Sequence, residues 1–147
     1  MKSVRKTVLV PHSIQRMYAL VDQVEDYPKF LPWCGGAATR ERTPESVVAE
    51  IQIAYHGIRQ TFVTRNDNRP SERIDMNFVR GPFRNLAGHW RFIPLGDLGC
   101  RVEFALDYEF ASSVLERLIG PIFDTITDSF VDAFVRRADA LHSAGTP

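Results

Sequence analysis

The side chains that could act as nucleophiles in this sequence lack the partners that nucleophilic catalysis needs. Ser112 and Ser113 follow Ala111 and precede Val114, so the glycines of a nucleophile elbow are missing. Cys34 has no histidine close to it in the sequence to serve as its base. The sequence therefore does not indicate covalent catalysis.

Three carboxylates could supply acid–base chemistry, because they recur at close spacing in one segment. Glu103, Asp107 and Glu109 alternate with apolar residues, which places all three on one face of a β-strand. The apolar side chains occupy the opposite face, so the carboxylates are expected in solvent, where nothing tunes them for catalysis. We therefore expect a protein that is not an enzyme, with no catalytic residue.

Metal and disulfide chemistry is not indicated either. The chain has four histidines with no second ligand at helical or hairpin spacing, namely His12, His56, His89 and His142. Two cysteines, Cys34 and Cys100, cannot form a disulfide framework, so we expect reduced thiols and a cytoplasmic protein. The apolar run 8–10 ends at Pro11 and is too short for a signal peptide or a membrane span. At most, peripheral contact with the inner membrane is expected.

Composition favours one globular domain, residues 1–147, with an aromatic interior. A chain of 147 residues buries about two thirds of the surface that its unfolded form exposes. Basic and acidic side chains number 18 each, so the net charge is zero and DNA binding is not expected. The ten phenylalanines stand out, because Phe-rich interiors often line a cavity for an apolar molecule, although they also form solid cores.

The elements that must position these side chains follow from the spacing of apolar residues. Residues 4–10 predict a strand that Pro11 ends, and Ser13 then caps a short amphipathic helix. Residues 26–32 suit one further helical turn between two prolines. From Cys34 to Phe110 the period is two, and five turn signals divide this segment into six strands. The turn signals occupy residues 43–45, 56–57, 66–71, 80–82 and 94–99.

The segment after Phe110 predicts a long helix with one broad apolar stripe. The stripe follows the spacing of a helix face and comprises Leu115, Leu118, Ile119, Ile122, Phe123, Ile126, Phe130 and Phe134. Gly120 and Pro121 interrupt the pattern, because Pro121 has no N–H and its ring crowds the carbonyl of Arg117. A kink or a fresh start of the helix is expected there.

The predicted order is strand, short helices, six strands and long helix, which is an α+β arrangement. Six hairpin-linked strands and the first strand can form one curved antiparallel sheet, and only the last helix is long and apolar enough to cover its apolar face. A helix wrapped by a bent sheet leaves a tapering space between them. The sequence leaves open whether side chains fill that space.

Two motifs resemble the signatures of a known family. The string Tyr27-Pro-Lys-Phe30-Leu31-Pro32-Trp33-Cys34 is similar to the Tyr-x-x-Phe-(Leu/Val)-Pro-Trp-Cys signature of the coenzyme-Q-binding START-domain proteins, within the polyketide cyclase/START superfamily. Gly81-Pro82-Phe83-Arg84-Asn85-Leu86, followed by Trp90-Arg-Phe92, resembles the second signature of that family. The likeness runs from about Arg5 to Leu141 and is to the bacterial branch of ribosome-association toxins (RatA type). Arg80 departs from the pattern, since members often carry an acidic residue before the Gly-Pro-Phe turn.

The resemblance implies a helix-grip fold (START-like, or Bet v 1-like), with a seven-stranded curved antiparallel sheet around the long C-terminal helix. It also implies an apolar cavity that binds ubiquinone or a related quinone and supports respiration, with no other cofactor required. For the bacterial branch it implies a partner, the large ribosomal subunit, and a role in blocking subunit joining. Cyclases and hydrolases of the superfamily offer a third function by analogy of fold alone.

The candidate ligand contacts are large side chains expected on the inner face of the sheet and on the apolar stripe of the last helix. They are Trp33, Phe62, Phe78, Trp90, Phe92, Phe104, Tyr108, Ile122, Phe123, Ile126 and Phe130. Tyr108, Trp90 and Trp33 could donate a hydrogen bond to a polar head group. Tyr27, Phe30 and Phe83 are expected at the cavity mouth, where Trp33 serves either as a lid or as a packing plug.

The middle of the chain is rich in arginine. Residues 59–101 carry eight arginines against four acidic residues, and these arginines could either contact ribosomal RNA phosphates or form an ordinary solvated sheet face. They are Arg59, Arg65, Arg69, Arg73, Arg80, Arg84, Arg91 and Arg101.

Overall fold

The computed structural model describes residues 1–142, and residues 143–147 of the predicted domain lie outside this range. Residues 1–142 form seven strands, two α-helices and two short 3-10 helices. The strands are β1 (Lys2–Val10), β2 (Cys34–Arg42), β3 (Ser46–Tyr55), β4 (Ile58–Arg69), β5 (Arg73–Arg80), β6 (Phe83–Pro94) and β7 (Cys100–Phe110). The helices are α1 (Ile14–Asp22), η1 (Val24–Lys29), η2 (Gly96–Leu98) and α2 (Ser113–Leu141).

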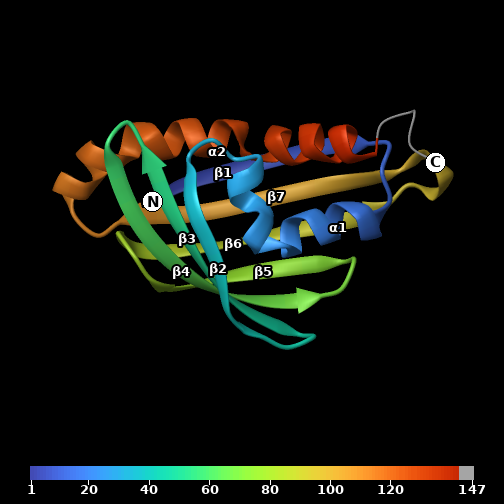
Figure 1. Cartoon of the computed structure of the whole chain (residues 1–147), viewed down its shortest axis with the longest axis horizontal. Helices are drawn as coiled ribbons and strands as arrows, with labels where there is room; N and C mark the ends of the chain where they lie inside the picture. Colours follow the sequence, from blue (N-terminus) through green and yellow to red (C-terminus); the bar gives the residue numbers. More distant parts are fainter. Residues whose placement is uncertain (143–147) are drawn as a thin grey trace.

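The strands form one antiparallel sheet in the order β1-β7-β6-β5-β4-β3-β2. Each strand from β2 to β7 lies beside its neighbour in the chain, and β1 pairs with β7 at the far edge. Figure 1 shows the sheet curving around α2, which lies along its length, with α1 on the same side. The predicted helix-grip fold, its seven-stranded sheet and its short helices after the first strand are confirmed.

The inner face of the sheet is apolar because the strands alternate. On β7 the five alternate side chains Val102, Phe104, Leu106, Tyr108 and Phe110 are all buried, as the sequence predicts. Opposite register positions on β6 place Trp90 against Phe104 and Phe92 against Val102. The burial of these rings against α2 supplies the main stabilisation of the core.

Helix α2 begins at a serine cap and continues without interruption. The Ser112 side chain accepts a hydrogen bond from the Leu115 N–H at 3.1 Å. The helix passes through Pro121 without restarting, so a fresh start at this position is wrong. Buried residues on both sides of Pro121, Ile119 and Phe123, hold the two halves against the sheet and offset the missing backbone hydrogen bond.

The apolar stripe of α2 is narrower than predicted. Leu118 is 54% exposed, because it lies at the edge of the stripe and beyond the cover of the sheet. No helix within residues 1–142 is long and apolar enough to cross a membrane.

Of two predicted turns, one is shorter in the structure than the sequence predicts and the other is as predicted. The predicted turn at residues 66–71 is too long, because β4 continues to Arg69 and pairs with β5 as far as Arg73. The Gly81 turn is as predicted and requires glycine, since its φ is +146° and an added Cβ would lie 2.6 Å from Phe62 Cβ.

Candidate ligand cavity

An apolar cavity of about 70 Å³ lies between the inner face of the sheet and α2. Elements from both ends of the chain line it: the α1–η1 segment, Trp33 just before β2, strands β3 to β7, and the middle of α2. Apolar residues outside the predicted set complete most of its wall, namely Val21, Val24, Ile51, Ile74, Met76, Leu86 and Leu106.

The structure brings most of the predicted ligand-contact residues together around this cavity. Those that line it are Trp33, Phe62, Trp90, Phe104, Phe123, Ile126 and Phe130, together with Tyr27. Those that do not line it are Phe78, Phe92, Tyr108 and Ile122, and the two mouth candidates Phe30 and Phe83.

Trp90 lies at the centre of the aromatic wall. Its ring centroid is 4.7 Å from Phe104, 5.7 Å from Phe130 and 5.2 Å from Phe134. Phe130 also packs 6.0 Å from Trp33. These tilted and edge-on contacts fix the wall formed by β6, β7 and α2.

The two mouth candidates outside the cavity lining have packing roles. Phe83 is 3% exposed and lies 5.1 Å from both Phe110 and Phe123. Phe30 packs edge-on against Phe134 at 5.1 Å, with the guanidinium of Arg137 5.4 Å from the centre of its ring. Phe83 thus fills the core between the sheet and α2, and Phe30 seals η1 against the C-terminal half of α2.

Two tyrosine hydroxyls near the cavity are already engaged. Tyr27 donates to the Val21 carbonyl at 2.5 Å, and Tyr108 donates to Asp124 Oδ1 at 3.1 Å. Burial raises the pKa of Tyr108 to about 12, helped by the nearby Asp124 charge, and burial raises the pKa of Tyr27 well above its usual range. Both phenols are therefore neutral structural donors, not free ligand contacts.

Three polar residues in the cavity wall were missed by the sequence reasoning. Thr64 and Asn66 project inward from β4, and Thr127 projects from α2. Thr64 Oγ1 donates to Asn66 Oδ1 at 2.9 Å, and Thr127 Oγ1 donates to the Asp124 carbonyl at 3.1 Å. Alternation along β4 could have identified Thr64 and Asn66, because they lie two and four residues, respectively, after the inward-facing Phe62.

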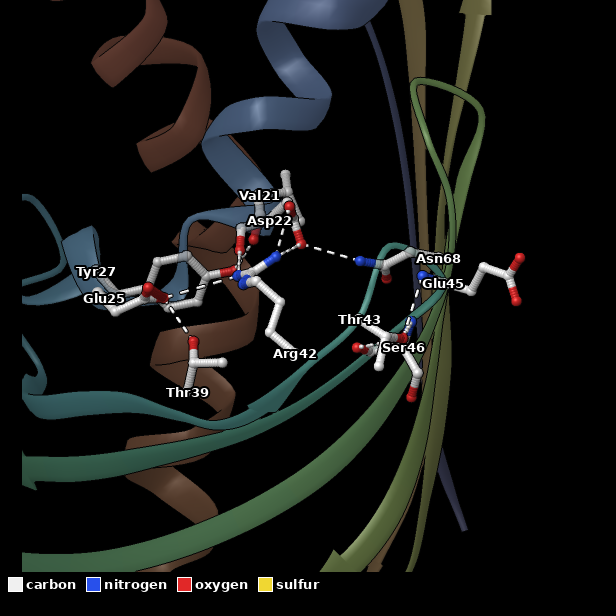
Figure 2. A network of polar contacts seen from close by, with 10 residues as sticks. All are labelled: Val21, Asp22, Glu25, Tyr27, Thr39, Arg42, Thr43, Glu45, Ser46 and Asn68. Carbon is white, nitrogen blue, oxygen red and sulfur yellow. Dashed lines mark hydrogen bonds and ion pairs between the residues drawn. The ribbon is translucent and has the colours of Figure 1, made fainter.

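A polar network holds the α1–η1 segment to the sheet beside the cavity. Figure 2 shows Asp22 at its centre: Arg42 Nη1 donates to its carboxylate at 3.0 and 3.1 Å, and Asn68 Nδ2 donates to Oδ1 at 2.9 Å. Glu25 accepts a hydrogen bond from Thr39 Oγ1 at 2.6 Å in the same network. These contacts join the end of α1 to β2 and β4 and keep that wall of the cavity closed.

The carboxylates considered for catalysis lie on the outer face of the sheet in ion pairs. Glu103 lies within 3.4 Å of Arg91 and 3.3 Å of Arg101, and Glu109 pairs with Arg84 at 3.1 Å. A hydrogen bond from Ser3, together with the Arg5 charge, lowers the pKa of Asp107.

Within residues 1–142 no cluster of His, Cys, Asp or Glu could hold a metal ion. Burial raises the pKa of both free thiols, Cys34 and Cys100.

The arginines of the middle segment divide into two groups. Five form ion pairs with carboxylates of the sheet, namely Arg73, Arg80, Arg84, Arg91 and Arg101. Arg59, Arg65 and Arg69 have no carboxylate within 4.0 Å among residues 1–142, and they alternate on the outward side of β4. A solvated, ion-paired sheet face therefore accounts for most of the segment, and β4 adds three arginines outside these ion pairs, with Asp67 between two of them on the same face.

The curved sheet, the gripped helix and the apolar cavity between them define a helix-grip protein of the START-like class. Residues 10–135 match the family described as polyketide cyclase / dehydrase and lipid transport, and the chain belongs to that family.

Among curated relatives, the ribosome association toxin RatA of Escherichia coli (strain K12) is 42% identical over 144 residues, covering 98% of this chain and 91% of that protein. The RatA protein of Vibrio cholerae is 40% identical and covers 97% of this chain and 99% of its own. A more distant relative is a mitochondrial coenzyme Q-binding protein COQ10 homolog B of Xenopus laevis, 27% identical over 88% of this chain and 55% of its own.

Solved structures share the fold over nearly the whole chain. The Zhui aromatase/cyclase of Streptomyces sp. R1128 has a TM-score of 0.84 at 15% identity and covers 99% of both chains. The 18 kDa protein CC1736 of Caulobacter crescentus has a TM-score of 0.75 at 33% identity, covering 98% of this chain and all of its own.

Proposed function

We propose that this protein binds a slender apolar molecule of the quinone class between the sheet and α2, and that it does no chemistry on that molecule. The observation that carries the proposal is the cavity itself, whose wall is aromatic and aliphatic apart from Thr64, Asn66 and Thr127. Burial of an apolar tail contributes about 25 cal/mol per Å² removed from water, enough to hold a lipid-like ligand without a charged anchor. The coenzyme Q-binding relative supports the ligand class. A role in respiration is part of the same proposal.

Ligand entry requires the cavity to widen. Its volume is about 70 Å³, whereas pockets for drug-sized ligands measure roughly 300–1,000 Å³. We assign the widening to the α1–η1 segment, because it contributes Val21, Val24 and Tyr27 to the lining and lies outside the hydrogen-bonded sheet. The polar network around Asp22 holds it in the closed position. Movement of this wall away from Trp90 and Phe130 opens the space that a quinone ring needs.

Native mass spectrometry of protein purified from its own host tests the proposal. The expected result is one quinone bound per chain, lost when Trp90 is replaced by Ala and retained when the exposed Leu118 is replaced by Ala. A protein that carries no apolar molecule and binds none when quinones are supplied would rule the proposal out.

A second function, association with the large ribosomal subunit, is favoured by the relatives named as ribosome association toxins, whose similarity covers nearly the whole chain. The row formed by Arg59, Arg65 and Arg69 is the surface that fits this role, because none of the three has a carboxylate within 4.0 Å among residues 1–142, and Asp67 is the one acidic residue of β4 on the same face. Co-sedimentation with large subunits across a salt series tests it. Binding should weaken steeply as salt rises, through counterion release, and binding that does not respond to salt would exclude this surface.

A further inference from the structure

Strand β4 places two polar side chains next to each other on the apolar wall of the cavity. Thr64 is 4% exposed and Asn66 is half-buried, and both line the cavity. Their neighbours on the inner face of β4 are Phe62 on one side and Asn68 on the other. Asn68 is committed to the Asp22 carboxylate at 2.9 Å, so its amide N–H belongs to the polar network outside the cavity.

The hydrogen bond between the two side chains determines which atoms of Asn66 have a partner within the protein. Thr64 Oγ1 donates to Asn66 Oδ1 at 2.9 Å, which orients the amide and occupies its oxygen. Within residues 1–142 no hydrogen bond leaves Asn66 Nδ2, so both of its N–H donors are free. A half-buried amide donor in an apolar wall is costly unless an acceptor meets it.

The polar residue on the helix side does not compete as a donor. Thr127 Oγ1 donates to the carbonyl of Asp124 in its own helix at 3.1 Å, and it is 4% exposed. Its hydroxyl proton is therefore used within α2. The phenols of Tyr27 and Tyr108 are likewise used, on Val21 and Asp124.

We propose that Thr64 and Asn66 form the polar recognition element of the cavity, with Asn66 donating to a carbonyl-type oxygen of the ligand and Thr64 positioning the Asn66 amide. The inference rests on the proposed binding of an apolar molecule and names the chemistry of that molecule's polar end. An oxygen acceptor, as in a quinone, ketone or ester, satisfies Nδ2, and a pure hydrocarbon does not. Asn66 thus determines which apolar molecules the cavity prefers.

A matched pair of small probes tests the inference by calorimetric titration. The probes are 2,3-dimethyl-1,4-naphthoquinone and 2,3-dimethylnaphthalene, which share a shape and differ in two carbonyl oxygens. The methyl groups block addition of Cys34 or Cys100 to the quinone ring. In Asn66→Leu, which keeps the branched shape and the number of heavy atoms and removes the donors, the preference for the quinone over the hydrocarbon should fall about tenfold, the usual effect of one hydrogen bond.

Two further variants separate recognition from packing. Thr64→Val should lower the same preference by a smaller factor, because the Asn66 donors remain and only their orientation is lost. Met76→Leu, in the lining but apolar, should change the affinity for both probes alike and leave their ratio unchanged.

The outcomes separate this inference from the proposed function. Failure of the wild-type protein to bind either probe or any quinone contradicts the proposed function. Binding of both probes with an unchanged ratio in Asn66→Leu contradicts the role of Asn66 alone. A wild-type preference for 1-naphthol, a hydroxyl donor, over the quinone would show that the amide presents its oxygen to the cavity and would overturn the inference.

Discussion

The hydroxyl of Tyr108 on β7 donates a hydrogen bond to Oδ1 of Asp124 on α2 at 3.1 Å. The same carboxylate lies 3.3 Å from Lys2 Nζ on β1, so one side chain joins the helix to two strands. The contact occupies a hydroxyl that the sequence suggested for a ligand head group, and it ties the stability of the fold to the protonation of a buried phenol.

Replacement of Tyr108 by Phe should make the unfolding free energy fall less steeply as the pH rises above 10. Unfolded tyrosine ionises near pH 10 and folded Tyr108 near pH 12. Because the folded pKa is raised, the stabilisation is complete below pH 10 and is lost as the pH rises towards 12, by about 2 kcal/mol for this group. Urea denaturation between pH 9 and 12 measures the slope. The variant should keep only the part of this pH dependence that comes from other tyrosines such as Tyr18. Identical slopes of unfolding free energy against pH in the variant and the wild type would contradict the raised pKa of Tyr108.

Replacement of Asp22 by Ala should loosen the α1–η1 segment. Arg42 and the buried Asn68 both lose their acceptor, so we expect a loss of about 1–3 kcal/mol of unfolding free energy. Amide exchange should accelerate over residues 14–29 more than in β6 or β7. The control is Asp26→Ala, whose only ion pair in residues 1–142 is a surface contact with Lys29, and which should cost less than about 0.5 kcal/mol. Equal effects of the two substitutions would show that the network does not anchor the segment.

Replacement of Phe123 by Asp should either unfold the protein or abolish binding of apolar molecules. Phe123 is 4% exposed and packs 4.7 Å from Tyr108 and 5.1 Å from Phe83, so a carboxylate there is buried without a partner. Phe123→Leu keeps the site apolar and should cost about 1–2 kcal/mol while preserving binding. Thermal unfolding and ligand titration measure both. A folded Asp variant with unchanged ligand affinity would show that this face of α2 does not border the binding cavity.

Replacement of Arg59, Arg65 and Arg69 by Gln should lower the salt dependence of association with large ribosomal subunits. If all three contact phosphates, the slope of log affinity against log salt should fall by about 2–3. The matched control replaces Arg73, Arg84 and Arg91, which are paired with carboxylates and should change the slope little. A larger effect of the control set would place the contact elsewhere on the sheet.

Most of the fold could be predicted because alternation and helical spacing are local signals. The five buried side chains of β7, the Ser13 cap of α1 and the long helix after Phe110 all follow from residues close together in the sequence. The exposure of Leu118 did not follow, because the width of the helix stripe that the sheet covers is a tertiary property.

The site was predictable in its aromatic part and not in its polar part. Trp33, Trp90 and Phe104 line the cavity. Large aromatic residues at positions expected to face inward can be recognised in the sequence. Phe83 turns into the core at an irregularity of the β6–β7 register, which no sequence pattern at a Gly-Pro turn reveals. The sequence places Asn66 at the start of a turn at residues 66–71, because asparagine is rare in strands, whereas its pairing with Met76 of β5 shows that β4 continues through it.

The pairing of β1 with β7 has a consequence for how the chain folds as it is made. Val10 lies opposite Cys100 and Lys2 opposite Tyr108, so the first strand emerges long before the strand with which it pairs. The nascent chain must carry an unpaired, β-prone N-terminal segment until nearly the whole sheet has been synthesised, and high contact order of this kind slows folding. Pulse-labelled amide exchange during refolding should therefore show protection of β1 appearing with that of β7 and no earlier. Pairing of β1 with β7 is therefore the last step in forming the sheet. A chain interrupted before residue 100 exposes unpaired strand edges that can aggregate.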